Sequence, residues 1–289
     1  MDGGVDEGDR RLAGMSALLL TPLLVFLLAF FVLPFGVMLY QSLYLSLLQS
    51  PAGSPMTFAN YTKAFGDAFY VRVLLQTVAL GVAVTALALV LGYPVAYFLA
   101  RTRSRRRHLL LFLVISPLVV SIVIRSYGWM VLLGRAGTVN TLLQALGIVE
   151  KPLPLMYNWF GVTVALVHVL LPFMILTLAS VIEGIPESLE DTAAVLGAGW
   201  WSRFRHVILP LSMEGVGAGV TLVFMLTIGS FVSILLLGGS DTLVLPLLIY
   251  QQIILLNNNF AAALGMLLLL LSVVLLYAQA RVFRVRGAM

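Results

Sequence analysis

Six long apolar runs constrain this chain more than any other feature of its sequence. They cover roughly residues 17–40, 71–99, 109–133, 160–182, 216–237 and 260–282. Each is about as long as the roughly 20 residues that a helix needs to cross the hydrocarbon layer of a membrane. Backbone polar groups inside that layer must be paired within their own segment, so the runs are predicted to be helices. The predicted fold is all-α: a polytopic membrane protein with about six transmembrane helices in a single domain, residues 1–289.

A seventh apolar run, residues 243–256, is shorter than the others. It is interrupted by Pro246 and carries Gln251 and Gln252, which favours a re-entrant or interfacial segment over another span. Composition agrees with a membrane protein, because 61% of the residues are hydrophobic and only 10% are charged, against about 25% charged in soluble domains. The absence of cysteine excludes disulfides, thiolate nucleophiles and cysteine-ligated metal centres.

Lysine and arginine are distributed unevenly among the segments that join the apolar runs. Twelve of the seventeen lie at the N-terminus, after the second and fourth runs, and in the C-terminal tail: Arg10, Arg11, Arg101, Arg103, Arg105, Arg106, Arg107, Arg203, Arg205, Arg281, Arg284 and Arg286. By the positive-inside rule these segments, and with them both termini, are predicted to be cytoplasmic. The net charge of +5 therefore reflects membrane topology, and no nucleic acid is expected as a partner.

The predicted cytoplasmic segment 184–213 is polar, yet it is patterned like a folded element. Pro186 suits the first turn of a helix, and Gly197 suits its C-terminal end. The first turn is acidic, as the helix dipole favours, with Glu187, Glu190 and Asp191. A narrow apolar face is formed by Leu189, Ala193 and Leu196, at i, i+4 and i+7. This pattern alone leaves two interpretations open: docking on a partner protein, or lying along the membrane interface.

The same segment resembles the cytoplasmic loop signature of binding-protein-dependent ABC importer permeases. In that signature Glu-Ala-Ala is followed after three residues by Gly, and nine residues later by Ile-x-Leu-Pro. The matching residues here are Asp191, Thr192, Ala193, Gly197, Val207, Leu209 and Pro210, with Asp for Glu, Thr for Ala and Val for Ile as departures. The resemblance implies a type I ABC importer permease fold. It also implies that the segment is a coupling helix that docks on an ATP-hydrolysing subunit.

The resemblance assigns an ATPase-coupling role to one set of residues: Glu187, Leu189, Asp191, Thr192, Ala193, Leu196, Gly197, Leu209 and Pro210. Because the chain has no Walker A sequence, ATP and Mg²⁺ are expected on a separate ATP-binding cassette subunit. This chain is expected to be a non-catalytic permease subunit without a cofactor of its own. The other expected partners are a second permease, identical or related, an external substrate-binding protein and the lipid of a bacterial inner membrane.

Apolar motifs outside the loop look like the spermidine/putrescine branch of these permeases. They are LGYPVAYFLAR at 91–101, LLLFLVISPL and IRSYGWMVLLG in the third run, and LLPFM at 170–174. The resemblance implies a polyamine as the transported solute, with an opine, a phosphonate or another small organic solute as the alternative. From another class, a membrane-embedded enzyme or an assembly factor that uses the polar loop as an interaction surface is also considered.

Three candidate substrate-path residues lie in the third run. Arg125 places a charge inside an apolar run, which costs at least about 2.5–3.5 kcal/mol unless it meets water or a partner, so it either belongs to the path or snorkels outward. Tyr127 and Trp129 fit an interfacial aromatic belt, with cation–π binding of an ammonium group as the alternative. His168, in the fourth run, is interpreted as a packing residue rather than a metal ligand.

Carboxylates are absent from the middle of every apolar run, and only Glu183 and Glu214 stand at the edge of one. Proton- or ion-coupled carriers need such groups at mid-membrane depth, so their absence argues against that class. It also indicates that substrate specificity resides in the external binding protein. Gly215, Gly217 and Gly219 open the fifth run and indicate close helix packing rather than a dinucleotide loop.

Overall fold

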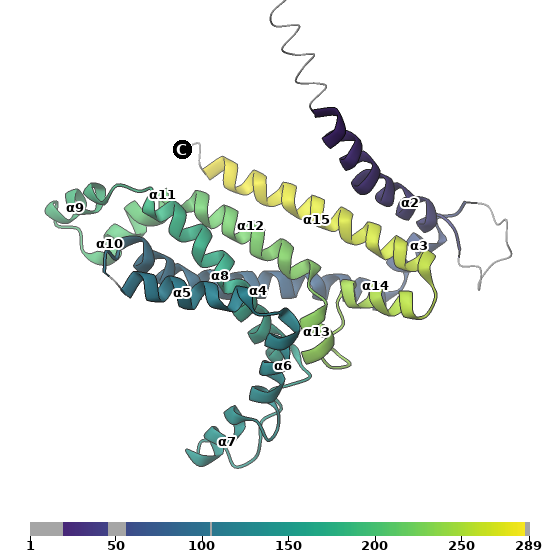
Figure 1. Cartoon of the computed structure of the whole chain (residues 1–289), viewed down its shortest axis with the longest axis horizontal. Coiled ribbons are helices and arrows are strands. Elements are labelled where there is room, and N and C mark those ends of the chain that lie inside the picture. Colours follow the sequence, from purple (N-terminus) through teal and green to yellow (C-terminus); the bar gives the residue numbers. More distant parts are fainter. Residues whose placement is uncertain (1–19, 46–55, 105, 287–289) are drawn as a thin grey trace, which may run out of the picture. The chain divides into compact units, whose positions relative to one another are not determined.

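The computed structural model describes residues 20–45, 56–104 and 106–286. They belong to two compact units: one comprises Met1–Gly66 with Gln251–Leu267, and the other Asp67–Tyr250 with Leu268–Met289. The described ranges contain helices and turns but no strand (Figure 1), so the all-α prediction is confirmed. Arg10, Arg11 and Arg105, which contributed to the predicted orientation, lie outside the described residues. The orientation and the single-domain organisation stay predictions.

The described residues contain six candidate spans when each bent helix pair is counted as one. Four are single helices: Leu20–Ser42, Ala68–Arg101 (α4), Trp159–Glu183 (α8) and Asn258–Gln279, the last within α15 (Asn258–Arg286). Two are bent pairs: Arg106–Val119 with Ile122–Ala145, and Trp200–Leu211 with Met213–Gly229. The predicted number of spans is therefore confirmed, while two of the predicted runs differ in shape.

The third run is not the continuous helix that hydropathy predicts. It is divided between α5 (Arg106–Val119) and α6 (Ile122–Leu133), and the chain bends by 101° at the break. Pro117 lacks the N–H that would bond to the carbonyl oxygen of Leu113, and the Ser116 hydroxyl donates to that oxygen instead, at 3.2 Å. A proline close to the end of α5 thus accounts for the early end of this helix.

The fifth run is also broken. Helix α12 (Met213–Gly229) ends at Ser230, whose hydroxyl donates back to the last turn at 2.8 Å. The rest of the predicted span forms the short helix α13 (Val232–Leu237). The hydroxyl oxygens of Ser126 on α6 and Ser233 on α13 lie 3.1 Å apart, and both residues are buried. Hydropathy counts apolar residues and cannot detect this change of direction.

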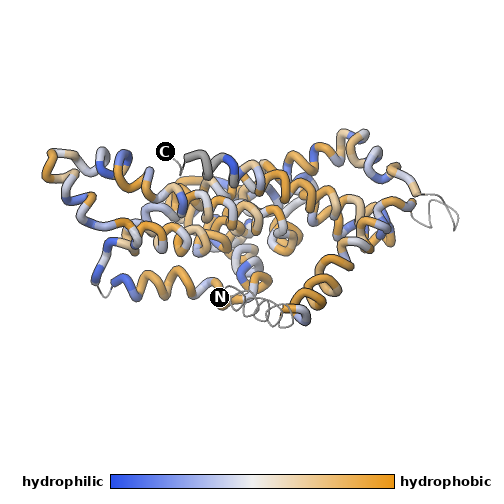
Figure 2. The backbone as a smooth tube through the Cα atoms, turned by 90° about the horizontal axis from the view of Figure 1, so that it is seen from above, coloured by the Kyte–Doolittle hydropathy of each residue, from blue (hydrophilic) through white to orange (hydrophobic). Residues whose placement is uncertain are grey.

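Helices α4, α8 and α12 pack together as the core of the second unit. Figure 2 shows that most of the described helices are hydrophobic along much of their length. Glycines allow α12 to approach α8 closely. A Cβ added at Gly215 would lie 2.8 Å from the Cβ of Val181, and one at Gly219 would lie 2.7 Å from the Sδ of Met174. The close packing predicted for these glycines is confirmed, and it occurs within this chain.

The seventh run forms the short helix α14 (Leu245–Ile254), whose ten residues are too few to cross a membrane. The prediction that it is not a span is confirmed. Its first turn is attached to α4, because the N–H of Leu245 donates to the Thr77 hydroxyl at 2.9 Å and both residues are buried.

In the first unit, the helix Leu20–Ser42 has no buried residue in its apolar stretch and exposes most of it, as a lipid-facing helix would. It contains a π-helical stretch, η1 (Leu28–Val32), directly before α2 (Leu33–Ser42), which carries Pro34 in its first turn. The short helix α3 (Ala59–Gly66) is tied to the end of α2 by Asn60, whose amide donates to the Ser42 carbonyl at 2.9 Å.

Candidate coupling site

The coupling segment, residues 184–213, begins with the short helix α9 (Glu187–Val195). The helix ends in a left-handed turn at Gly197, where φ is +86°. The N–H groups of Gly197 and Ala198 donate to the carbonyls of Ala194 and Ala193, each at 3.0 Å, which is the hydrogen-bond pattern of a Schellman cap. Both the helix and the glycine that ends it are therefore present where the sequence predicts them.

The apolar face predicted for α9 is exposed. Leu189 is 43% exposed and Leu196, just past the helix end, is 82% exposed. Asp191 and Thr192, at two of the signature positions, are exposed as well, and Ala193 is half-buried. In α9, every residue of which the structure describes, Glu190 alone is buried. The helix therefore presents its apolar side chains outward and turns a carboxylate toward its own chain.

Glu190 is held by the end of α4. The Arg101 Nε donates to its Oε1 at 2.7 Å, and Nη2 lies 2.6 Å from the same oxygen as an ion-pair contact without hydrogen-bond alignment. The Tyr97 hydroxyl donates to Oε2 at 2.8 Å. Sequence reasoning missed this cluster because Arg101 counted there as a topology marker and Glu190 as a helix-dipole residue. The signal was available in the spacing of Tyr93, Tyr97 and Arg101, which places all three on one face of α4.

The second half of the coupling segment is aromatic. It comprises α10 (Trp200–Arg203), the π-helical η2 (Phe204–Ile208) and α11 (Leu209–Leu211). Trp200 and Phe204 stack with ring centroids 5.8 Å apart, and the Phe204 ring also meets the edge of Tyr93 at 5.3 Å. Pro210 lies in the first turn after η2, the arrangement also found around η1. A π-helical stretch before a Leu-Pro pair thus occurs in both units.

Two further ion pairs join the segment after α4 to the residues around α9, and both are more exposed. Arg103 contacts Glu187 at 3.0 Å with the arginine side chain 84% exposed. Arg107 pairs with Glu183, the last residue of α8. In Figure 2 the hydrophilic residues of this connection flank the grey break between α4 and α5. Arg103 and Arg107, which contributed to the predicted orientation, therefore also meet acidic residues in and just before the coupling segment.

Among the substrate-path candidates, Trp129 and Tyr127 lie in different surroundings, Trp129 against the helix core and Tyr127 exposed. The indole Nε1 of Trp129 donates to the Nδ1 of His168 at 3.2 Å, and the two rings meet edge to face at 5.5 Å. Trp129 is half-buried against the helix core, and whether its ring also lies in an interfacial belt stays a prediction. The hydrogen bond to His168 agrees with the interpretation of that histidine as a packing residue.

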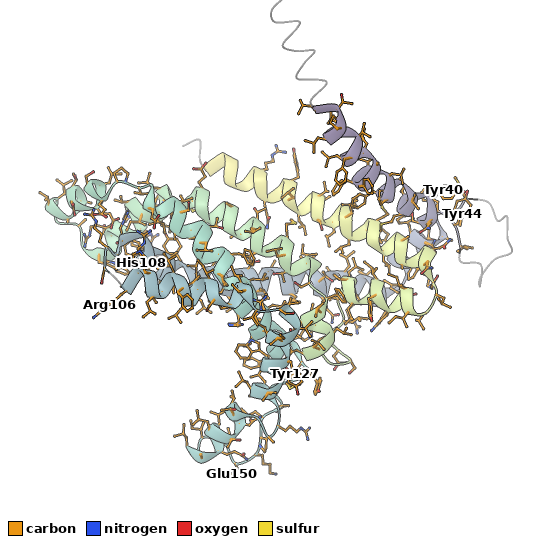
Figure 3. All side chains as sticks on the ribbon, viewed as in Figure 1. Tyr40, Tyr44, Arg106, His108, Tyr127 and Glu150 are labelled. Carbon is orange, nitrogen blue, oxygen red and sulfur yellow. The ribbon has the colours of Figure 1, made fainter. Side chains whose placement is uncertain are left out.

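Tyr127 points away from the helix core and is 64% exposed, since it lies two residues, or about 200°, around α6 from Trp129. Together with Arg135 and Tyr157 it lines a cavity of about 510 Å³. Figure 3 shows Tyr127 on α6, well away from Arg106 and His108 at the start of α5. Tyr157 has a left-handed backbone with φ of +59°, a strained conformation for a tyrosine.

Arg125 is half-buried on α6, and its Nε and Nη1 atoms have no hydrogen-bond partner among the described residues. Arg125, Tyr127 and Trp129 thus share one helix but not one site. No group of three or more His, Cys, Asp or Glu residues is placed to hold a metal ion in the part of the chain that the structure describes. The expectation of no cofactor on this chain stays a prediction.

Comparisons with known proteins agree with this geometry. The spermidine/putrescine transport system permease protein PotB of Haemophilus influenzae is 40% identical over 190 residues, which are 66% of each chain. Its Escherichia coli counterpart is 39% identical over 189 residues, covering 65% of this chain and 68% of the relative.

The fold is also found in a crystal structure of a bacterial ABC transporter involved in the import of the acidic polysaccharide alginate. One of its chains matches with a TM-score of 0.76 at 20% identity, covering 98% of this chain and 99% of that chain. At this identity the likeness shows a shared fold. The family described as "Binding-protein-dependent transport system inner membrane component" matches residues 88–286. The chain belongs to this family of transport-system inner membrane components.

Proposed function

We propose that this chain is the permease subunit of an ATP-driven importer that moves a polyamine, spermidine or putrescine, across the bacterial inner membrane. The single observation that carries the proposal is α9, a capped helix with an exposed apolar face in a chain of this family. Its two PotB relatives are named as spermidine/putrescine permeases, which supports the solute class.

In this proposal α9 docks on the ATPase subunit through the side that carries Leu189 and Leu196. The left-handed turn at Gly197 lets the chain reverse at the end of the docking surface, and Leu209 and Pro210 lead it back toward α12. ATP and Mg²⁺ bind the partner ATPase, and closure of the ATPase displaces α9. Both termini lie with α9 on the cytoplasmic side, as the arginine distribution favours.

The substrate comes from an external binding protein and passes this subunit without tight binding. No carboxylate lies within the apolar runs, so a polyamine is held only by aromatic faces, carbonyls and hydroxyls, which bind weakly and release readily. A second candidate is an anionic solute such as a phosphonate. The observation that favours it is Arg125, whose Nε and Nη1 have no acceptor among the described residues and would repel a polycation.

The test is uptake in vesicles that contain the chain with its ATPase, a second permease and the external binding protein. The proposal expects saturable, ATP-dependent accumulation of radiolabelled spermidine that requires the binding protein. Uptake of a phosphonate but not of spermidine would transfer the function to the anionic solute. A chain that co-purifies with no nucleotide-binding protein and supports no uptake would contradict the proposal and favour a membrane enzyme or assembly factor.

A further inference from the structure

One face of α4 contacts both halves of the coupling segment. Tyr93, Tyr97 and Arg101 are spaced by four residues, and we name them the α4 stripe. Tyr93 lies 2.6 Å from the Ser212 hydroxyl, which is fully buried at the start of α12. Tyr97 and Arg101 both bind Glu190 of α9. A single helix of the core therefore carries the contacts at the two ends of the coupling segment.

The donor at Tyr93 can be assigned. The Ser212 hydroxyl has one hydrogen, and it is directed at the Leu209 carbonyl oxygen, 3.1 Å away. The Tyr93 hydroxyl therefore donates to Ser212. This contact fixes α4 to the point where the chain bends by 66° between Trp200–Leu211 and Met213–Gly229.

Burial shows that apolar packing does not hold α9 on its own chain. Its larger apolar side chains, Leu189 and Val195, are exposed, and Glu190 is its one buried residue, at 8%. Glu187 and Glu190 are three residues apart and share a face that meets one arginine at the end of α4 and one just after it. Leu189 and Leu196 share a different face. The carboxylate face is thus the attachment of α9, and the apolar face is left for a partner.

The buried ion pair joins three helices at one guanidinium group. Besides Glu190 on α9, Arg101 at the end of α4 donates from Nη1 to the Ile182 carbonyl oxygen in the last turn of α8, at 3.1 Å. Both carboxylate oxygens of Glu190 have a donor, and the two side chains are only 14% and 11% exposed. A buried pair contributes little to stability compared with apolar side chains, but it fixes the relative position of the groups it joins.

We infer that the Arg101–Glu190 pair, supported by Tyr97, is the link through which displacement of α9 reaches α4 and α8. Arg101 and Glu190 are positioning residues: they touch neither ATP nor solute, and they act through the helices they join. The inference rests on the proposed function, in which the ATPase displaces α9. The exposed Arg103–Glu187 pair is screened by solvent and does not serve as the link.

The first experiment compares Glu190→Gln with Arg103→Gln in the reconstituted complex with the ATPase, the second permease and the binding protein. Glutamine keeps the size of Glu190 but removes its charge, so solute transported per ATP hydrolysed should fall at least about fivefold, the low end of coupling between distant sites. Arg103→Gln should leave this ratio within about twofold, as expected for an exposed pair. An unchanged ratio in Glu190→Gln would overturn the inference.

A second experiment distinguishes transmission through the Arg101–Glu190 pair from a role of these two residues in folding alone. The chain contains no cysteine, so Arg101→Cys/Glu190→Cys can be joined selectively by a short, reducible, thiol-specific cross-linker. Transport per ATP should be low before cross-linking, recover after it, and fall again on reduction, all in the same sample. A ratio that does not recover in the cross-linked protein would overturn the inference. If the wild-type complex shows no ATP-dependent uptake, the proposed function fails instead.

Discussion

Two half-buried arginines, Arg101 beside the coupling segment and Arg125 on α6, differ in whether their guanidinium groups find acceptors within the described residues. Arg101 reaches a carboxylate and a backbone carbonyl, and the same carboxylate also accepts from a tyrosine. Arg125 on α6 leaves Nε and Nη1 without an acceptor among the described residues. Arg101 therefore finds a carboxylate and a carbonyl acceptor within this chain, whereas Nε and Nη1 of Arg125 depend on solvent, solute or another subunit for theirs.

The side chains around these two arginines differ in the same way: those near the coupling segment are bonded and packed, and those on α6 are more exposed. Around the coupling segment the hydroxyl groups of Tyr93 and Tyr97 both have hydrogen-bond partners, and glycines on α12 allow that helix to contact α8. On α6, Tyr127 is exposed beside a cavity, and a Cβ added at Gly128 would meet no atom within 4 Å. Substitutions near the coupling segment are therefore expected to have larger effects than matched substitutions on α6.

The largest effect is expected at Gly197. Gly197→Pro cannot keep a φ of +86°, because the proline ring fixes φ near −65°, and it removes the N–H that donates to Ala194. Transport and substrate-stimulated ATP hydrolysis should both be abolished while the chain remains inserted. The matched control is Gly199→Ala, where φ is −65° and an added Cβ meets nothing within 4 Å. Normal uptake by correctly inserted Gly197→Pro would show that the docking role is wrong.

A smaller effect, on the free energy of unfolding, is expected to differ between a glycine in the helix core and a glycine on α6. Gly215→Ala places a Cβ 2.8 Å from the Cβ of Val181 and should lower the free energy of unfolding by about 1–3 kcal/mol, the usual cost of overpacking. Gly128→Ala, in open space on α6, should raise it by up to about 1 kcal/mol, because alanine favours the helix. Thermal unfolding in detergent measures both. Equal shifts would show that α12 and α8 are not closely packed.

The smallest effects are expected at the α6 aromatics. Tyr127→Ala should lower the maximal uptake rate about two- to fivefold, corresponding to one cation–π contact of roughly 0.5–1 kcal/mol, with little change in apparent affinity. Trp129→Ala should also act on rate, through the lost hydrogen bond to His168. Uptake is measured with saturating binding protein. A large rise in the half-saturating concentration at an unchanged rate would instead place the specificity site in this subunit.

The sequence predicts the membrane fold well because hydropathy and length are properties of single segments. It also predicts α9 and its glycine stop, since caps and periodicity are local signals. The bends before Ile122 and at Ser230 are not predicted, because hydropathy reports how long and how apolar a run is but not where its helix changes direction. Pro117 was visible in the sequence, but a proline is compatible with a kinked span as well as with a break.

The attachment of α9 could not be predicted because it depends on a contact between residues far apart in the chain. Arg101 and Glu190 each have a sufficient local explanation, one as a topology marker and the other as an acid in a first helical turn. Only the fold brings them within 2.7 Å. The contact of Trp129 with His168 could not be predicted for the same reason, since its partner lies on another helix.

Site-specific photo-cross-linking to the co-expressed ATPase tests most directly whether α9 docks on that subunit. The chain has no cysteine, so Leu196→Cys and Tyr127→Cys each provide one attachment point for a photoreactive label, both at exposed positions. The label at residue 196, beside the Gly197 turn, is expected to capture the ATPase, and the label at residue 127 is not. Capture from residue 127, or no capture from residue 196 in a transport-competent complex, would contradict this docking.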